Sequence, residues 1–359
     1  MKHRISAAML ICLCTFLCLA PACKKKKDAD PVPVREQWTL MPKTQVYYGN
    51  RNIIAAYADE KNLFFLTPFM MYTFDSSMTK NNAQLFDVPG YDNGNLGVKF
   101  GREFRIFNNF DKSAIVVADN IRRYNASSNA LLARDLHPGG EAWIYTYTAP
   151  GDQSVFYLAY GLKTPGTEDS VDIYLNCYKV VRNTYVDIDL QWGKKVLTNY
   201  HQQVFHGEVS YLNEAGGIVY MTSGGITFRL ENGVVTDTLR HSIKSLASVG
   251  NELYANVRGS FFPPNEQKPE GLLRSVDKGK TWDYTGTGSS FADGRLQVMG
   301  GHLYLLTWYG IVQLDVSGGT KDINRIDGEI RSMSLFHDRV YIGTDAGVYV
   351  KSYKTFIED

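Results

Sequence analysis

The sequence predicts an all-β fold, and three observations support this prediction. From Gln37 onward, short runs rich in Val, Ile, Leu, Tyr and Phe alternate with Gly, Asn, Asp and Ser. This texture is typical of strands joined by turns. Aromatic residues make up 13% of the chain, and such side chains pack well on pleated sheets. No long segment carries the apolar stripe of an amphipathic helix.

Related segments recur along the chain and predict how the strands are grouped. Residues 340–348 (VYIGTDAGV) align with residues 303–311 (LYLLTWYGI), and residues 219–226 (VYMTSGGI) are a shortened copy. Each copy reads as a strand, a Thr-x-x-Gly type of turn and another strand. Looser copies complete a set of seven apolar runs, centred near residues 65, 116, 157, 220, 254, 304 and 341. Because a four-stranded propeller blade takes about 40–50 residues, the spacing predicts a β-propeller of seven four-stranded blades, with six or eight as alternatives.

The two ends of this region are predicted to close the ring together. The last repeat runs through residues 331–351, which leaves only residues 353–359, too few for a fourth strand. Near the start, residues 37–41 (QWTLM) form a strand with no blade of their own. We therefore expect residues 37–41 to supply the outer strand of the last blade and to pair edges that would otherwise be bare.

The segment 275–282 (SVDKGKTW) predicts a tight hairpin. Gly279 suits a left-handed backbone position, and the Asp277 carboxylate can accept hydrogen bonds from its own turn. The pattern Ser-x-Asp-x-Gly-x-Thr-Trp resembles the Asp-box, the BNR repeat motif of sialidases and other β-propellers. The resemblance implies a loop between the third and fourth strands of a blade. It gives a structural role to Ser275, Asp277, Gly279, Thr281 and Trp282.

The first residues predict export and a lipid anchor. Residues 1–22 combine a basic start with an apolar core at 7–20 that is too short to span a bilayer comfortably. Residues 20–23 (APAC) resemble a lipobox, which implies a lipoprotein signal peptide and lipidation of Cys23; an ordinary secretory signal is the alternative. Residues 23–36 then form the lipidated cysteine and a disordered tether, and residues 37–359 form the propeller domain. The start resembles lipoproteins of the Bacteroidota, so the expected location is the cell envelope, at the outer membrane, periplasmic or surface-facing.

Charge and cysteine content restrict the possible ligands. The formal net charge of +1 gives no support for a nucleic-acid partner. Beyond the anchor region the chain has Cys177, which reads as a buried strand residue rather than a catalytic thiol. No metal-ligand spacing or phosphate-binding glycine loop stands out, so neither a metal nor a cofactor is expected.

Aromatic residues on one predicted face suggest a binding site. Successive strands are antiparallel, so the second–third turns and the links between blades share one face of the ring. These segments carry Phe261, Phe262, Phe291, Trp308 and Tyr309. An exposed aromatic patch would mark an interaction site, whereas burial under a folded loop is the alternative. The leading hypothesis is therefore a non-catalytic binding or scaffolding propeller for a glycan or protein.

Arg105 is the candidate residue of a catalytic alternative. Residues 103–107 (EFRIF) resemble the Phe/Tyr-Arg-Ile-Pro motif of sialidases, with Phe107 in place of the proline. The resemblance implies that Arg105 pairs bidentately with a substrate carboxylate in a sialidase-like glycoside hydrolase. The family's acid, its two further arginines and its Tyr–Glu pair are not identified in this sequence. A third alternative is a subunit of a larger envelope assembly.

Overall fold

The computed structural model divides into two units, Met1–Glu36 and Gln37–Asp359. The structure describes residues 37–42, 52–53, 55–58, 60–67, 70–78, 80–85, 105–108, 113–117, 121–125, 145–148, 155–164, 166, 170–182, 186–201, 209–223, 225–258, 269–288, 291, 294–308, 310–314, 320–323 and 326–358. Within these ranges, no helix has the length and apolar character needed to cross a membrane.

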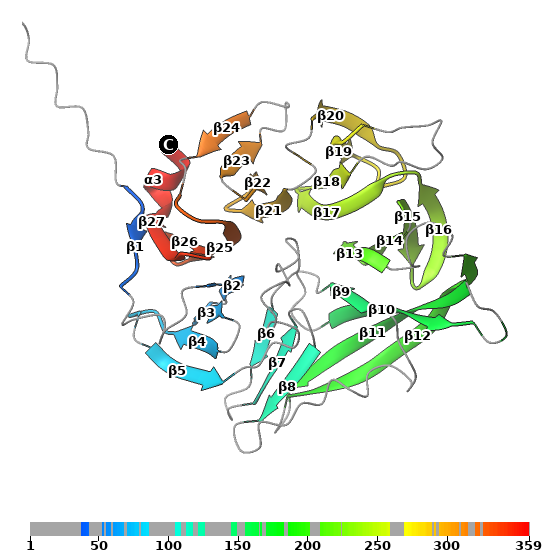
Figure 1. Ribbon diagram of the computed structural model, residues 1–359, viewed down its shortest axis with the longest axis horizontal. Coiled ribbons are helices and arrows are strands. Elements are labelled where there is room, and N and C mark those ends of the chain that lie inside the picture. The colour runs from blue at the N-terminus through cyan, green and yellow to red at the C-terminus, as the bar shows by residue number, and fades with distance from the viewer. Residues whose placement is uncertain are drawn as a thin grey trace, which may run out of the picture. The chain divides into compact units, whose positions relative to one another are not determined.

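The described strands form seven antiparallel sheets, six with four strands and one with three (Figure 1). We number the sheets in chain order. Sheet 1 contains β2 (Ala55–Ala58), β3 (Leu63–Leu66), β4 (Met70–Phe74) and β5 (Lys80–Leu85). Sheet 2 contains β6 (Arg105–Asn108), β7 (Ser113–Val117) and β8 (Ile121–Asn125). Sheet 3 contains β9 (Tyr145–Thr148), β10 (Val155–Lys163), β11 (Ser170–Arg182) and β12 (Val186–His201).

The second half of the chain repeats the same arrangement. Sheet 4 contains β13 (Val209–Ala215), β14 (Ile218–Ser223), β15 (Ile226–Glu231) and β16 (Val234–Leu239). Sheet 5 contains β17 (Ser242–Val249), β18 (Glu252–Arg258), β19 (Gly271–Ser275) and β20 (Asp283–Thr287). Sheet 6 contains β21 (Arg295–Met299), β22 (His302–Leu306), β23 (Ile311–Leu314) and β24 (Thr320–Ile323). Sheet 7 contains β1 (Thr39–Leu40), β25 (Ile330–Phe336), β26 (Arg339–Thr344) and β27 (Gly347–Ser352).

The seven predicted apolar runs are strands, and each is the second strand of its sheet. They form β3, β7, β10, β14, β18, β22 and β26. The first strands lie innermost in Figure 1, and the contacts β9–β13, β13–β17, β17–β21 and β25–β2 join consecutive sheets. The described residues thus contain seven sheets. The number of blades, seven, stays a prediction.

Apolar side chains fill the space between consecutive sheets. Alternate residues of a strand point to opposite sides, so a covered strand contributes to two cores. In β14, Val219 and Met221 pack towards sheet 3, whereas Tyr220 packs towards sheet 5. All six residues of β14 are accordingly buried. Burial of each large apolar side chain contributes roughly 1.5–3 kcal/mol, which makes these cores a major source of stability.

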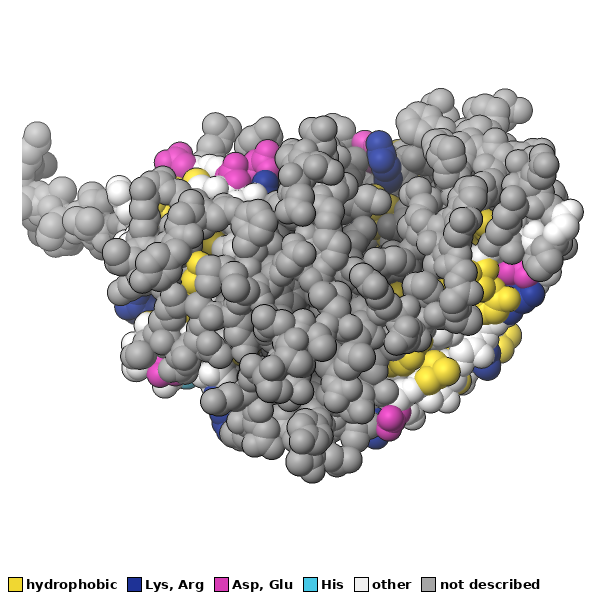
Figure 2. Space-filling view, turned by 60° about the horizontal axis from the view of Figure 1, so that its bottom comes forward, with side chains coloured by type: hydrophobic (Ala, Val, Ile, Leu, Met, Phe, Trp, Pro, Cys, Tyr) yellow, Lys and Arg dark blue, Asp and Glu magenta, His cyan; other side chains and the backbone are white. Residues whose placement is uncertain are grey.

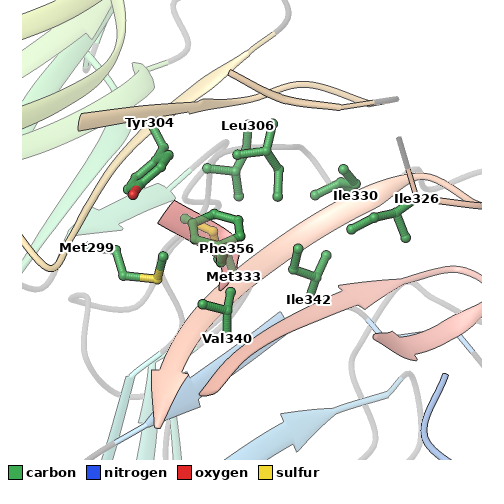
Figure 3. Packing of buried hydrophobic residues seen from close by; sticks show 10 residues of the cluster. Met299, Tyr304, Leu306, Ile326, Ile330, Met333, Val340, Ile342 and Phe356 are labelled. Carbon is green, nitrogen blue, oxygen red and sulfur yellow. The ribbon is translucent and has the colours of Figure 1, made fainter. Parts of the chain in front are cut away.

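The core between sheets 6 and 7 illustrates this packing (Figure 3). It contains ten buried residues, drawn from both sheets, the intervening link and the C-terminal helix: Met299, Tyr304, Leu306, Ile311, Ile326, Ile330, Met333, Val340, Ile342 and Phe356. Sheets 7 and 1 share a comparable core that includes Ile53, Phe65 and Tyr341. The hydrophobic contact therefore continues from the last sheet to the first.

The N-terminal strand closes the ring, as the sequence predicts. β1 is the outer strand of sheet 7, in the order β1-β27-β26-β25. It pairs antiparallel with β27, with Thr39 opposite Val350 and Leu40 opposite Tyr349. The Met41 amide then donates a 2.9 Å hydrogen bond to the carbonyl of Val348.

The C-terminus adds an element that the sequence did not predict. Helix α3 (Tyr353–Glu358) follows β27 directly and buries Phe356. The Phe356 ring lies 5.4 Å from that of Tyr304 and 5.8 Å, edge-on, from that of Trp38. Lys351 is buried, and its ammonium lies 5.6 Å from the Trp38 ring centroid, a cation–π arrangement. Both ends of the unit Gln37–Asp359 therefore pack at sheet 7.

Sheet 3 differs from the others in the length of its strands. β11 has 13 residues and β12 has 16. In the other sheets, every described strand except the short β1 has four to eight residues. β12 contacts sheet 4, because Lys194 Nζ donates a 2.5 Å hydrogen bond to the carbonyl of Asn232. Two apolar side chains of these strands are exposed: Leu190 of β12 is 57% exposed, and Val234 of β16 is 55% exposed. Figure 2 shows hydrophobic and basic side chains side by side along the right-hand edge, the side on which β12 and β16 lie in Figure 1.

Candidate functional site

The turns between second and third strands lie at the same end of the sheets as the links between sheets, and we call this end the link face. Two of its turns have the same internal bracing. Thr344 Oγ1 donates a 3.0 Å hydrogen bond to the carbonyl of Gly347, and Thr307 Oγ1 makes the same bond to Gly310. The repeated Thr-x-x-Gly pattern therefore has a local cause, because the threonine hydroxyl closes each turn.

Each of these turns also holds the beginning of the next sheet. The Ile330 amide donates to the Trp308 carbonyl at 2.9 Å, and the Ile53 amide donates to the Thr344 carbonyl at 2.9 Å. These bonds join sheet 6 to sheet 7 and sheet 7 to sheet 1. A bonded turn and a bonded strand start leave little local freedom, so side chains on this part of the link face are positioned in advance.

The buried side-chain amide of Asn256 joins sheets 5 and 6 through hydrogen bonds. Asn256 Nδ2 donates to the carbonyls of Phe291 and Gly294, at 2.9 and 2.7 Å. Its Oδ1 accepts hydrogen bonds from the amide of Ser245, at 2.8 Å, and from the Ser245 hydroxyl. All of these groups are buried, where an unpaired polar atom would cost free energy. Asn256 thus fixes the link between two sheets.

The structure places two of the five predicted aromatic residues. Phe291 is only 9% exposed and belongs to the core between sheets 5 and 6, so the buried alternative applies to it. Trp308 is half-buried and packs against the core between sheets 6 and 7. Phe261, Phe262 and Tyr309 lie outside the described residues. Of the two described members, Trp308 is therefore the one that lies near the surface of the link face.

Charged residues lie at the start of β25, next to Ile330, whose amide binds the Trp308 carbonyl. Arg331 Nη1 donates a 2.5 Å hydrogen bond to Asn52 Oδ1, and Nη2 lies 3.2 Å from Glu329 Oε2. The Glu329 amide donates to Asp345 Oδ1 at 2.8 Å. The Arg331 side chain is mostly buried, with 13% of it exposed. Acids, a base and an amide from sheet 7 and from the links before β25 and β2 thus meet on the link face.

Two further basic residues occupy corresponding places on the neighbouring innermost strands. Lys244 lies near the start of β17, and Arg295 is the first residue of β21. Lys244 and Arg331 both fall at β-bulges, since the pairing register shifts between Ile243 and Ser245 and between Ile330 and Ser332. Sequence reasoning missed these basic residues, because a bulge depends on the register between strands rather than on composition.

The 275–282 loop lies at the other end of sheet 5, between its third and fourth strands, as the sequence predicts. Asp277 accepts hydrogen bonds from the Lys280 amide at 2.9 Å and from the Thr281 hydroxyl at 2.6 Å. Ser275 Oγ donates to Asp277 at 2.8 Å and accepts from the Gly279 amide at 2.8 Å. Gly279 has a φ of 75°, in the left-handed region. The hydrogen bonds of Thr281 hold the pKa of Asp277 well below its usual range.

Side chains of sheet 4 contact this loop. The Tyr220 ring meets Trp282 edge-on at 6.2 Å, and Trp282 Nε1 donates a 3.0 Å hydrogen bond to the Gly279 carbonyl. Arg229, which is buried, donates to the Lys278 carbonyl at 3.1 Å. A Cβ on Gly279 would collide with the Tyr220 hydroxyl. Burial raises the pKa of Tyr220 to about 12, as expected for a hydroxyl enclosed by neighbours.

The catalytic alternative receives a partial structural test. Arg105 is the first residue of β6, the innermost strand of sheet 2. A tyrosine–glutamate contact exists elsewhere, because the Tyr254 hydroxyl donates to Glu252 Oε2 at 2.6 Å and Arg274 binds the same carboxylate. Burial, followed by the Glu252 carboxylate, raises the pKa of Tyr254 to about 12. A nucleophilic tyrosine needs activation, so this arrangement suits a structural hydrogen bond.

Metal and thiol chemistry can be judged only for the part of the chain that the structure describes. There, no group of three His, Cys, Asp or Glu side chains is arranged to hold a metal ion. Cys177 is buried in β11, and burial raises the pKa of its thiol, which disfavours the reactive thiolate. Cys23 lies outside the described residues.

Comparisons with known proteins show the fold. No family model matches the sequence, and a comparison with curated proteins finds no match. Among solved structures, the extracellular domain of BT4673 from B. thetaiotaomicron is similar over 88% of this chain, with 12% identity and a TM-score of 0.51. This chain spans 40% of the length of that domain. The WD40 domain of Neurospora crassa Pan2 is similar over 88% of this chain and 95% of its own, with 10% identity and a TM-score of 0.52. Together with the repeated antiparallel sheets, these similarities show that the chain folds as a β-propeller.

Proposed function

We propose that this chain is a lipid-anchored, cell-envelope β-propeller that binds or scaffolds a glycan or protein through its link face, without catalysis. The bracing of that face is the observation that carries the proposal. Turns of sheets 6 and 7 are closed by Thr307 and Thr344, and each also holds the next sheet through a backbone hydrogen bond. A rigid surface loses little conformational entropy when it binds a ligand. Trp308 stands on one of these braced turns.

Anchoring at the membrane rests on the sequence. Residues 1–22 resemble a lipoprotein signal peptide, Cys23 is the proposed lipidation site, and residues 23–36 are the proposed tether. The matched domain of BT4673 is extracellular, and an exported position is part of the proposal for this chain too. The destination proposed is the outer membrane.

The 275–282 loop supports an Asp-box as part of the proposal. Its Asp277, Ser275 and Thr281 side chains serve the loop's own hydrogen bonds, and its Trp282 and Gly279 pack against sheet 4. Each of the five motif residues therefore has a structural task. The ligand-binding surface is accordingly proposed for the link face rather than for the loop.

A glycan array on the full chain in detergent tests the proposal, with mass spectrometry of the array sugars afterwards. Binding without cleavage is expected. Trp308→Ala should weaken binding at least about tenfold, a loss of ~1.4 kcal/mol, while Val276→Ala, an exposed position on the opposite end of sheet 5, should leave binding unchanged. Melting temperatures of both variants show whether the fold is retained.

Other outcomes point to the other hypotheses. Cleavage of a sugar would contradict the proposal, favour the sialidase-like glycoside hydrolase and make Arg105 the first residue to substitute. If the array shows neither binding nor cleavage, the glycans on it are excluded as ligands and a protein ligand is favoured. Stable co-purification with a defined envelope protein would then indicate a subunit of a larger assembly.

A further inference from the structure

We infer that Lys244, Arg295 and Arg331 form a basic row on the link face that binds the carboxylate or sulfate groups of an acidic glycan. This inference rests on the proposed function and specifies its ligand class. The three residues come from β17, β21 and β25, the innermost strands of three consecutive sheets. We call them the basic row.

Two hydrogen bonds between the strands show that the basic row is level. The Leu296 amide of β21 donates to Ser245 Oγ of β17 at 2.8 Å, and these residues directly follow Arg295 and Lys244. Gln297 Nε2 of β21 donates to the Met333 carbonyl of β25 at 2.8 Å. Gln297 and Met333 each lie two positions after their basic residue. The row therefore crosses the three strands at one height.

The strand pairing is irregular at two positions of the basic row. Lys244 and Arg331 are the extra residues of two β-bulges at equivalent places in sheets 5 and 7. A bulge re-aims a side chain and is frequent beside binding sites. Lys244 and Arg295 are half-buried, and the Arg331 side chain is 13% exposed, so part of each long side chain packs against the protein. A held stem reduces the entropy lost when the charged end binds an anion.

Arg331 is positioned by two neighbours in particular. Asn52 Oδ1 and Glu329 Oε2 accept from its two terminal nitrogens, at 2.5 and 3.2 Å. These contacts set the plane of the guanidinium, which has five N–H donors and can therefore contact protein acceptors and an anion together. The acceptors come from the links before β2 and β25, so both flanking segments orient this cation.

The surroundings of the row favour a sugar over a simple polyanion. Trp308 is tied to the start of β25 by the Ile330 amide, one position before Arg331, and its ring offers a flat apolar surface. Glu329 lies at the same strand start, and its amide binds Asp345 in the turn between β26 and β27. Their carboxylates can accept hydrogen bonds from sugar hydroxyls, which a simple polyanion lacks. Cations, hydroxyl acceptors and an indole together match a glycan that bears acid groups.

Titration calorimetry on the full chain in detergent tests this inference. The probes are oligogalacturonate for carboxylates, chondroitin sulfate oligosaccharide for sulfates, a neutral malto-oligosaccharide, and poly-glutamate for acidic peptide. The variants are Lys244→Gln, Arg295→Gln and Arg331→Gln, with Arg331→Lys to keep the charge. Arg339→Gln is the matched control, because Arg339 is exposed at the opposite end of sheet 7. Melting temperatures accompany every titration.

One acidic sugar should bind better than the neutral sugar, and added salt should weaken it. Each Gln variant should lose at least about tenfold in affinity, ~1.4 kcal/mol, whereas R331K should recover most of that loss and R339Q should behave as the wild type. Tighter binding of the carboxylate probe or of the sulfate probe identifies the acid group.

Four results would overturn the inference. The first is equal affinity for acidic and neutral sugars, which would leave the proposed function intact. The second is binding of poly-glutamate in place of the sugars, which would assign the row to an acidic peptide. The third is an acidic sugar that binds all folded Gln variants as tightly as the wild type. A failure of every probe also overturns the basic row, whereas the wider glycan array decides the proposed function separately.

Discussion

The Tyr220 hydroxyl donates a 2.9 Å hydrogen bond to the carbonyl oxygen of Lys278, and this contact joins sheet 4 to the 275–282 loop of sheet 5. Lys278 and Gly279 have φ values of 62° and 75°. The left-handed turn exposes the Lys278 carbonyl to sheet 4, where Arg229 donates to the same oxygen. The loop therefore connects two sheets as well as two strands.

Tyr220→Phe should destabilise the protein by about 1 kcal/mol, because one buried hydrogen bond is lost while the ring is retained. The denaturant midpoint of unfolding measures this change. Tyr284→Phe is the control, since the Tyr284 hydroxyl bonds to Pro269 from an exposed position of β20 and should matter less. Equal stability of Tyr220→Phe and the wild type would show that Arg229 alone holds the loop.

Asp277→Asn should lower stability at neutral pH and change its dependence on acid. The folded pKa of Asp277 is depressed by its hydrogen bonds, first those of Thr281. Its contribution is therefore complete above the unfolded pKa of about 3.9 and is lost as the pH falls through the folded pKa. Denaturant midpoints measured from neutral to strongly acidic pH should show the difference between wild type and Asp277→Asn shrinking in acid. A constant difference, or the same change in an Asp283→Asn control on exposed β20, would contradict this account.

Deletion of residues 31–42 should lower the melting temperature of the whole domain. The deletion removes β1 from the edge of sheet 7 and takes Trp38 away from Phe356 and Lys351. Deletion of residues 24–30, in the proposed tether, is the control and should leave the melting temperature unchanged. An unchanged value for the longer deletion would mean that β27 does not need the N-terminal strand.

Gly343→Ala should destabilise the contact between sheets 7 and 1. A Cβ at this position would lie 2.6 Å from both Ile53 Cγ2 and Ser332 Oγ, and overpacking of this kind costs roughly 1–3 kcal/mol. Gly310→Ala is a matched control, because its Cβ would meet only Thr307 Oγ1, at an ordinary 3.9 Å. Unfolding curves of the two variants give the comparison, and equal stability would indicate that Ile53 shifts without cost.

Much of the fold could be predicted because its signals are local. Apolar runs and turn chemistry placed the second strand of every sheet, and the Thr-x-x-Gly pattern placed turns that Thr307 and Thr344 do close. The strand at 37–41 could be paired with the last repeat because a three-stranded remainder lacks an edge partner. Helix α3 escaped prediction, because six residues are too few for a periodic apolar signal.

The candidate site was harder to predict because it depends on contacts between distant residues. Phe291 looked like a surface aromatic in a link, yet Asn256, 35 positions away, binds its carbonyl and draws it into a core. The level of Lys244, Arg295 and Arg331 follows from strand register and bulges, which composition does not encode. Turn chemistry could indicate the face, but only the packing between sheets could indicate which side chains remain near its surface.

The pairing of Thr39 with Val350 also dictates an order of events during synthesis. The two partners are separated by roughly 310 positions, so their meeting carries the loop-closure entropy of nearly the entire domain. Residues 37–41 are synthesised long before the final strand and have no partner until it emerges. A chain that stops before β27, or one that a protease trims as far as β1, loses this pairing. The pairing of β1 with β27 therefore reports whether both edge strands of sheet 7 are present.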